Sequence, residues 1–586
     1  MKSFIKNILS TTLALIISLV LIFSVFIFVI SSGLSKNEKN ISVSENSILF
    51  FNLSKANIVE RKSTNPLEIL NNSGKIVKTI ELKQILDNIE KAKKDNSIKG
   101  IYINVSAINA GISQIEEIRN KLINFKISGK KVIAYSETYS QNAYYLVSVA
   151  DKIYLNPEGI IELKGLSATT LFYKGLLEKI SVDVQIVRHG NFKSAIEPFT
   201  LKQMSNENRM QLSTMLNSLS KNMFNNIALE RNISLDQINK NANKLELNSA
   251  KKCLNLSYVD AIIYEDQVYD TLKTISENQK LNLIDINQYS NINKNINKNT
   301  SRNKIAIIYA NGTIQNGEGD ENKIGSTTTV KAIKKAANDK NTKAIVLRIN
   351  SGGGSALASD VIWRELKLIK NIKPIVVSMG DYAASGGYYI ACVADKIVAN
   401  PNTITGSIGV FGMIPNMQDF YKNKLGVTID TVNTHKYADI GINRPLSSYE
   451  RKKIKENIKN VYNTFVNKVA SGRQKSVEYI NEVAQGKIWS GLHAKNIGLI
   501  DTIGGIENAI EIAANLANIK DFRVISLPIK KDPLTQLALE ISNDTHFKKM
   551  VLNKIGFQSN LTNPIEDLIF NDDMIQTRIP FIIKLK

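Results

Sequence analysis

The chain contains few of the residues that form disulfides and metal sites. Only two cysteines and four histidines occur among its 586 residues. Cys253 and Cys392 stand at unrelated places, and Cys392 falls in an apolar helical pattern, so we expect both to be small buried hydrophobic side chains. The histidines show no ligand spacing, which argues against a zinc site. The composition therefore predicts a protein with no metal centre.

Acidic residues are also in deficit, with 53 Asp and Glu against 75 Lys and Arg, for a formal net charge of +22. A strong positive charge is typical of proteins that bind nucleic acid or anionic lipid. No block of Lys and Arg with interleaved aromatic residues occurs, and the surplus is spread along a chain rich in Asn. We therefore expect no nucleic-acid binding. Compositional bias explains most of the charge, and contact with an anionic membrane surface is the alternative.

Long apolar runs are scarce, with one exception near the N-terminus. Residues 8–30 carry no charge, and these 23 residues would form a helix of roughly 34 Å, enough to cross a bilayer core. The run is longer than the apolar core of a cleaved signal peptide, and it is not followed by a typical cleavage site of small residues. Lys2 and Lys6 precede it. The pattern predicts an uncleaved single-pass anchor in a bacterial inner membrane, with the N-terminus in the cytoplasm and the remaining domains on the extracytoplasmic side.

The chain is rich in internal similarity at an offset of 244 positions. Residues 149–153 (Val-Ala-Asp-Lys-Ile) recur as residues 393–397, and Asp95 corresponds to Asp339. A register held without gaps over about sixty residues indicates duplication of a whole domain. In both copies short apolar strands alternate with helical patterns of 10–15 residues, which is typical of βαβ units and a buried, mostly parallel sheet.

These patterns predict an α/β protein of two tandem domains with one transmembrane helix. The expected segments are an N-terminus and anchor at 1–35, a first repeat at 46–278, an Asn- and Lys-rich linker at 279–303, a second repeat at 304–528 and a tail at 529–586.

The two copies differ in the residues that carry chemistry. Only the second copy has a glycine-rich turn at residues 351–355 (Ser-Gly-Gly-Gly-Ser) and the sequence Ala384-Ser385-Gly386-Gly387. Ser385 follows a predicted strand and opens a predicted helix, and both motifs lie where the carboxyl ends of parallel strands meet. A serine flanked by N–H groups of glycine turns suits acyl transfer, because such groups stabilise an oxyanion.

A nucleophilic serine needs a base, and the sequence offers no obvious histidine and no Gly-x-Ser-x-Gly elbow. Lysine is the alternative, but only its neutral form is a base, so its pKa must fall from about 10.4 to near 7–8. Burial at a domain interface would supply the desolvation. Lys193 in the first copy has aromatic neighbours, although spacing alone does not distinguish it from the other lysines.

Four ordered motifs give the chain a specific resemblance to a known family. It resembles signal peptide peptidase A (SppA) in its long, duplicated form, protease IV, from the anchor to about residue 525. The motifs are Lys193-Ser194-Ala195-Ile196-Glu197-Pro198-Phe199, Ala383-Ala384-Ser385-Gly386-Gly387-Tyr388-Tyr389, Ala399-Asn400-Pro401 with Thr405-Gly406-Ser407-Ile408-Gly409, and Trp489-Ser490-Gly491 leading to Gly498-Leu499-Ile500-Asp501.

The resemblance implies a role for each site residue. Ser385 would be the nucleophile, Lys193 the general base and Ser407 a hydroxyl that orients the lysine amine. It also implies a ClpP/crotonase-like fold in each repeat, a membrane-anchored homotetramer, no metal or cofactor, and signal peptides or other apolar peptides as substrates.

The chain departs from the family pattern at two points. The proline usual in the second-copy glycine turn is absent, so the oxyanion donor that accompanies Gly386 can be Gly353 or Gly354. In addition, Lys436 lies opposite Lys193 in the repeat alignment and is an alternative base, although its neighbours lack the Ser-Ala-Ile-Glu-Pro-Phe pattern.

We therefore predict a membrane-anchored Ser/Lys endopeptidase that works through an acyl-enzyme. Two alternatives remain at this point: a crotonase-like acyl-CoA enzyme, which needs glycine turns but no serine nucleophile, and a non-catalytic membrane scaffold, which has no reason to keep the serine and the lysine.

Overall fold

The computed structural model describes residues 10–15, 17–18, 21, 43–63, 78–292, 300–530 and 575–579. Within these residues no helix is both long enough and apolar enough to cross a membrane. The predicted anchor at 8–30 lies mostly outside them, so it stays a prediction.

The first copy is built on a six-stranded parallel sheet with the order β8-β6-β5-β4-β1-β9. Ile101, Ile103 and Val132 on its strands are fully buried, as expected for a parallel sheet covered on its faces. The strands are β1 (Ser47–Asn52), β4 (Ile98–Asn104), β5 (Lys131–Ser136), β6 (Lys152–Leu155), β8 (Ala261–Ile262) and β9 (Leu283–Asp285), and a small separate sheet pairs β2 (Asn57–Val59) with β3 (Thr79–Glu81).

The second copy repeats this plan in an eight-stranded sheet whose central strands run parallel. Only the pairing of β17 with β19 in this sheet is antiparallel, among the strands that the structure describes. The strands are β10 (Lys304–Asn311), β13 (Thr342–Ser351), β15 (Ile375–Ala384), β16 (Lys396–Ala399), β17 (Ile404–Gly406), β19 (Ile488–Ser490), β20 (Thr502–Ile503) and β21 (Arg523–Leu527).

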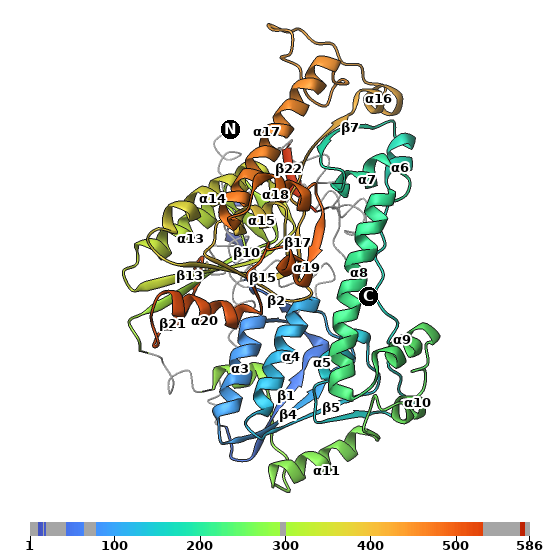
Figure 1. Ribbon diagram of the computed structural model, residues 1–586, viewed down its shortest axis with the longest axis vertical. Coiled ribbons are helices and arrows are strands. Elements are labelled where there is room, and N and C mark those ends of the chain that lie inside the picture. The colour runs from blue at the N-terminus through green and yellow to red at the C-terminus, as the bar shows by residue number, and fades with distance from the viewer. Residues whose placement is uncertain are drawn as a thin grey trace.

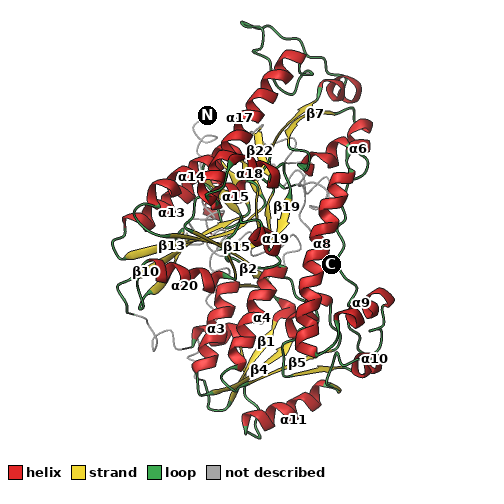
Figure 2. Cartoon of the chain, viewed as in Figure 1, coloured by secondary structure: helices red, strands yellow, loops and turns green. Residues whose placement is uncertain are grey.

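Helices cover both sheets and join the copies (Figures 1 and 2). The long helix α8 runs from the first sheet toward the second copy, where Ser218 hydrogen-bonds Ser490 at 2.8 Å. In the first copy the helices are α3 (Leu82–Lys94), α4 (Ile112–Lys126), α5 (Gln141–Val147), α6 (Lys174–Lys179), α7 (Glu197–Thr200), α8 (Asn206–Arg231), α9 (Leu235–Lys244), α10 (Ala250–Asn255), α11 (Glu265–Ser276) and α12 (Ile286–Asn291). In the second copy they are α13 (Ser326–Asn338), α14 (Ala356–Ile369), α15 (Gly386–Ala391), α16 (Gln418–Phe420), α17 (Ser448–Arg473), α18 (Val477–Val483), α19 (Gly491–Asn496) and α20 (Ile506–Leu516).

The duplication extends to individual hydrogen bonds. Helices α3 and α13 both have 13 residues and stand 244 positions apart, and α8 and α17 both have 26. The Tyr144 hydroxyl donates to the Tyr258 carbonyl at 2.8 Å, and the Tyr388 hydroxyl donates to the Leu499 carbonyl at 2.7 Å. Each buried tyrosine therefore ties its helix to the same later turn of its own copy.

A third, mixed sheet is shared by the two copies, with the order β12-β11-β14-β22-β18-β7. Strand β7 of the first copy runs antiparallel to β18 of the second over seven residue pairs. The sheet consists of β7 (Asp183–His189), β11 (Thr313–Gln315), β12 (Lys323–Gly325), β14 (Gly353–Ser355), β18 (Val410–Asn416) and β22 (Ile575–Arg578).

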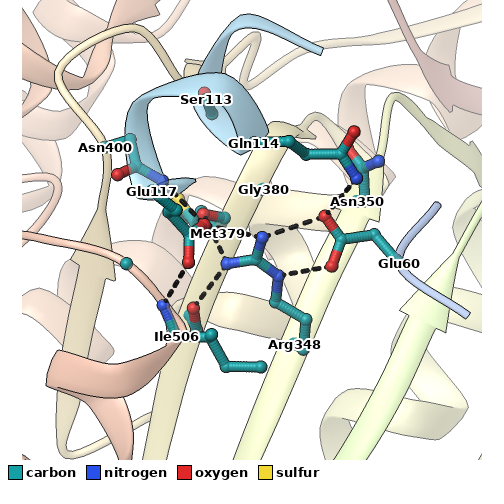
Figure 3. Close-up of polar contacts among 12 residues, drawn as sticks. Glu60, Ser113, Gln114, Glu117, Arg348, Asn350, Met379, Gly380, Asn400 and Ile506 are labelled. Carbon is teal, nitrogen blue, oxygen red and sulfur yellow. Dashed lines mark hydrogen bonds and ion pairs between the residues drawn. The ribbon is translucent and has the colours of Figure 1, made fainter. Parts of the chain in front are cut away.

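A buried ionic cluster also connects the copies (Figure 3). Arg348 of β13 donates twice to Glu60, at 2.8 and 2.9 Å, and once to Glu117 at 2.8 Å. Glu117 lies on α4 of the first copy and accepts further bonds from Asn400 and from the Ile506 backbone. Because both carboxylates and the guanidinium are almost fully buried, their pairing fixes how one copy sits on the other.

The predicted linker at 279–303 differs from the structure. Strand β9 pairs with β1, and α12 follows it, so the first copy continues to Asn291. Ile284, Ile286 and Tyr289 are buried there. The high Asn and Lys content conceals these spaced apolar residues, and their burial stabilises the segment against the first sheet.

Candidate active site

Ser385 stands at the junction between β15 and α15, where the prediction expected it. It is the N-cap of α15 and has φ 56° and ψ −113°, a conformation that non-glycine residues rarely adopt. Its N–H donates to the Gly406 carbonyl at 2.7 Å, and its carbonyl accepts from Tyr389 at 2.8 Å. A strained backbone held by bonds on both sides is typical of a functional position.

Lys193 reaches this serine because of the ladder between the two copies. Strand β7 ends at His189, which pairs with Val410 at the start of β18. Lys193 follows β7 by four residues, and Ser407 precedes β18 by three. The antiparallel pairing therefore carries a lysine of the first copy and a serine of the second to the same end of the shared sheet.

The three side chains form a connected group inside one chain. Lys193 Nζ lies 2.7 Å from Ser385 Oγ, and it lies 3.1 Å from both the carbonyl oxygen and Oγ of Ser407. A neutral amine has two N–H donors and one lone pair. Two donors directed at Ser407 leave the lone pair for the Ser385 hydroxyl, which is the arrangement that a general base requires.

Burial supplies the electrostatic condition for this arrangement. The Lys193 side chain is completely buried, and this desolvation holds its pKa well below the usual 10.5. The positive charge of Arg578 lowers the pKa further. Both effects favour the neutral amine, and each pKa unit corresponds to about 1.36 kcal/mol.

Two glycines lie close to each other near the serine, because Gly386 follows Ser385 directly and Gly353 lies against Gly386. Gly353 has φ 102°, and a Cβ built on it would come within 2.7 Å of Gly386 N. The Gly353 N–H donates a hydrogen bond to Ser351 Oγ at 3.1 Å. Both glycines also pair with β22, Gly353 opposite Arg578 and Gly354 opposite Thr577, and Gly354 pairs in addition with Ile314 of β11. The structure therefore brings Gly353 and Gly386 together, and a side chain at Gly353 would close the space between them.

The alternative base is not part of this group. Lys436 is exposed to solvent, and its Nζ lies 5.4 Å from the centre of the Tyr437 ring. Ser385, in contrast, is fully buried.

The sequence did not indicate the residues that hold Lys193 in place. Gly486 has φ 82°, and a Cβ on it would lie 2.7 Å from Lys193 Cα. A Cβ on Gly409 would lie 3.2 Å from Lys193 Cδ. Phe192 N–H donates to the Gln485 carbonyl at 2.9 Å, so this turn lies directly against the lysine backbone. Gly409 stands within a recognised motif, whereas Gly486 carries no local signal.

Comparison with known proteins supports a single family. The model of peptidase family S49 matches residues 124–280 and 367–520, once in each copy. Protease 4 of Haemophilus influenzae is 36% identical over 455 residues, which cover 74% of this chain and 74% of that protein. Protease 4 of Salmonella typhi is 36% identical over 456 residues, covering 75% and 72%. The chloroplastic serine protease SPPA of Arabidopsis thaliana is 33% identical over 468 residues, covering 78% and 69%.

Among solved structures, a ClpP1 mutant from Listeria monocytogenes matches 35% of this chain and 94% of its own, with 16% identity and a TM-score of 0.23. A score this low carries no argument about the fold, so the ClpP/crotonase-like assignment stays a prediction.

Proposed function

Since this chain belongs to peptidase family S49 and is a serine protease, we propose that Ser385 is its nucleophile and Lys193 its general base. The observation that carries the proposal is the 2.7 Å contact between a buried lysine amine and a serine hydroxyl. Burial holds the pKa of that amine well below its usual value, which favours the neutral form that acts as a base. The family membership decides against the acyl-CoA enzyme and the inert scaffold.

In the proposed reaction, neutral Lys193 takes the proton of Ser385 Oγ as this oxygen attacks the peptide carbonyl carbon. Ser407 accepts hydrogen bonds from the amine and directs its lone pair at the serine. The resulting ammonium then donates its proton to the leaving nitrogen, and the peptide bond breaks to give an acyl-enzyme. Lysine, again neutral, activates a water that hydrolyses the ester and restores Ser385.

The oxyanion of each tetrahedral intermediate would rest on the N–H groups of Gly386 and Gly353, and the Gly353 N–H would exchange its bond to Ser351 Oγ for one to the oxyanion. The proximity of these two residues favours Gly353 over Gly354 as the second donor. Loss of one such donor typically costs about 2.7–4 kcal/mol of transition-state stabilisation.

We further propose that the substrates are cleaved signal peptides and other apolar peptides close to a bacterial inner membrane. The motifs shared with signal peptide peptidase A and the apolar run at residues 8–30 support this proposal. A single-pass anchor would keep the catalytic domains on the extracytoplasmic face, beside such substrates. The proposed assembly is a homotetramer, although Ser385 and Lys193 already meet within one chain.

A serine-directed acylating probe tests the catalytic assignment. Wild-type protein should be labelled, and Ser385→Ala should remove the label while leaving the melting temperature similar. Lys193→Met, which keeps the length and apolar packing of the stem, should slow labelling and peptide hydrolysis by roughly 10²–10⁴-fold. Lys436→Ala is the matched control, because it removes an exposed lysine. Undiminished labelling of Ser385→Ala would refute the nucleophile, and a fully active Lys193→Met would refute the base.

A further inference from the structure

A buried glutamine of α8 lies against the turn that carries Lys193. Gln211 has 8% of its surface exposed, and its Nε2 donates to the Phe192 carbonyl at 3.1 Å and to Ser194 Oγ at 3.0 Å. Phe192 and Ser194 are the residues directly before and after Lys193. One amide group therefore contacts the chain on both sides of the proposed base, and the Phe192 carbonyl belongs to the peptide bond that joins this residue to the lysine.

The oxygen of the same amide faces the second copy. Gln211 Oε1 accepts from the Ile488 N–H at 3.4 Å. Ile488 lies in β19 opposite Gly406 of β17, whose carbonyl accepts the N–H of Ser385. The carbonyl of the residue before Ile488 accepts the Ser407 N–H at 2.6 Å. Gln211 thus links the turn of the proposed base to the segment that holds the nucleophile and Ser407.

A buried carboxylate sets the direction in which this amide faces. Glu197 accepts from Asn208 Nδ2 at 2.9 Å, so the Asn208 amide presents its Oδ1 on the opposite side. That Oδ1 accepts from Gln211 Nε2 at 3.3 Å. Glu197 also accepts from the N–H and the hydroxyl of Ser205, the N-cap of α8, at 3.2 and 2.6 Å. Because each donor faces the next acceptor, the N–H groups of Gln211 are directed toward the lysine turn.

The helix that presents Gln211 is fixed to the second copy by apolar contacts. Leu212 and Met215 of α8 are buried in one cluster with Ile488 of β19. Side chains in a close-packed interface have little freedom to shift. The amide of Gln211 therefore extends from a backbone that does not follow movements of the lysine turn.

The bond to Phe192 is not needed to satisfy a buried carbonyl. The Phe192 carbonyl already accepts from the Ser194 N–H at 2.9 Å, and the Phe192 N–H donates to the Gln485 carbonyl at 2.9 Å. A buried backbone group that has one partner is already satisfied. The additional bond from Gln211 therefore acts as a geometric constraint, and it holds the turn from one side while Gln485 holds it from the other.

We propose that Gln211 is a positioning residue for the general base: its amide holds the peptide bond before Lys193 in place and thereby keeps the lysine amine within reach of Ser385. This inference rests on the proposed function, because it takes Lys193 as the base and Ser385 as the nucleophile. It deepens that function by naming a side chain that acts on the reaction only through the lysine. Lys193 Nζ lies 2.7 Å from Ser385 Oγ, and a misplacement of about 1 Å in a reacting group costs roughly 10²-fold in rate.

Gln211→Met tests the proposal, because methionine keeps the length of the side chain and removes its hydrogen bonds. Its kcat for a fluorogenic peptide should fall by roughly 10- to 100-fold, with KM within about threefold of the parent's. A displaced amine is less completely desolvated, so the midpoint of the pH profile of kcat/KM should move up toward the ordinary lysine pKa. A role confined to stability would lower the melting temperature and leave this midpoint and the kcat of the folded protein unchanged.

Gln141→Met is the matched control. Gln141 is 4% exposed, and its amide accepts from the N–H groups of Lys164 and Gly165 at 3.0 and 2.9 Å and donates to the Gly165 carbonyl at 3.1 Å. Both variants remove a buried amide from the backbone that it bonds, and the backbone that Gln141 bonds is not the lysine turn. If Gln211→Met does not fold, Gln211→Asn replaces it, because this amide is one methylene shorter and is withdrawn from the turn; the same changes are expected.

A double-mutant cycle with Lys193→Met shows whether the effect of Gln211 passes through the lysine. The two losses should not add, so the serine-directed probe should label the double variant no more slowly than Lys193→Met alone. Additive losses, an unmoved pH midpoint, or a kcat of Gln211→Met within about threefold of the Gln141→Met control would overturn the proposal. Failure of the proposed function is a separate result, because it would appear as full activity of Lys193→Met itself.

Discussion

A methyl group at Gly486 offers a sharp test of how precisely Lys193 must be placed. A Cβ on this glycine would lie 2.5 Å from Lys193 N, 2.7 Å from Cα and 2.8 Å from Cβ. Non-bonded carbon atoms normally approach to about 3.5–4.0 Å, so the two backbones must separate by roughly 1 Å. That shift is transmitted to an amine that now lies 2.7 Å from Ser385 Oγ.

We expect Gly486→Ala to lower kcat by roughly 10²-fold, the loss typical of a 1 Å misplacement of a reacting group. Alanine at φ 82° also carries a conformational cost of about 1–2 kcal/mol. For a domain of this size such a cost lowers the melting temperature by roughly 2–8 °C. The rate effect must therefore be separated from the effect on stability.

Gly129→Ala provides that separation. Gly129 has φ 83°, nearly the same as Gly486, but nothing lies within 4 Å of its Cβ position. The two variants share the backbone cost, and only Gly486→Ala adds the clash with Lys193. Hydrolysis of a fluorogenic peptide, measured beside thermal unfolding, should show normal kcat for Gly129→Ala. If kcat of Gly486→Ala stays within about threefold of that control, the argument from lysine placement is wrong.

Three further predictions follow from the same structure. Only the neutral Lys193 amine can act as the proposed base, so kcat/KM should rise with pH. It should level off at a pH well below 10.5, because burial lowers the lysine pKa. A kcat/KM that falls as the pH rises toward this plateau would contradict the assignment. Arg348→Met should lower the free energy of unfolding by about 3–5 kcal/mol, because Glu60 and Glu117 lose their buried cation. Thermal unfolding at neutral pH should show a much smaller loss when Glu60 and Glu117 are also changed to Gln. Lys436→Ala should leave the pH–rate profile unchanged, and a shifted profile would show that this exposed lysine contributes to the reaction.

The parallel sheets were predictable because each of their strands has a recognisable local sequence pattern. The apolar runs at residues 101–103 and 345–347 lie in β4 and β13, whose side chains are buried on both faces of a sheet. The 244-residue offset adds a second, independent signal, and it reappears in the bounds of α3 and α13. The position of Ser385 was likewise predictable from the sequence, because a serine between a strand and a pair of glycines forms a recognisable local pattern.

The contacts between distant segments were not predictable in the same way. Strand β7 has polar residues interspersed along it, and its partner β18 lies more than 200 positions away. The sequence around Gly486 is that of an ordinary turn, and only the folded structure shows that this glycine lies against Lys193. The short polar strand β22 depends wholly on the edges that β14 and β18 present. In each case the structure of the segment depends on contacts with a partner segment far away in the sequence. The local sequence pattern carries no information about such contacts.

The shared sheet explains why this duplicated chain has one member of the proposed catalytic pair in each copy. Within the described residues 426–447 of the second copy, no strand follows β18 to pair with it, and Lys436, at the position opposite Lys193, is exposed there. The partner of β18 is instead β7, which ends four residues before Lys193. Each copy therefore supplies one strand of the ladder and one member of the pair, so the two functional side chains meet only where both copies are folded against each other. The buried bonds from Arg348 to Glu60 and Glu117 hold that arrangement, so the proposed catalytic site depends on the interface between the copies.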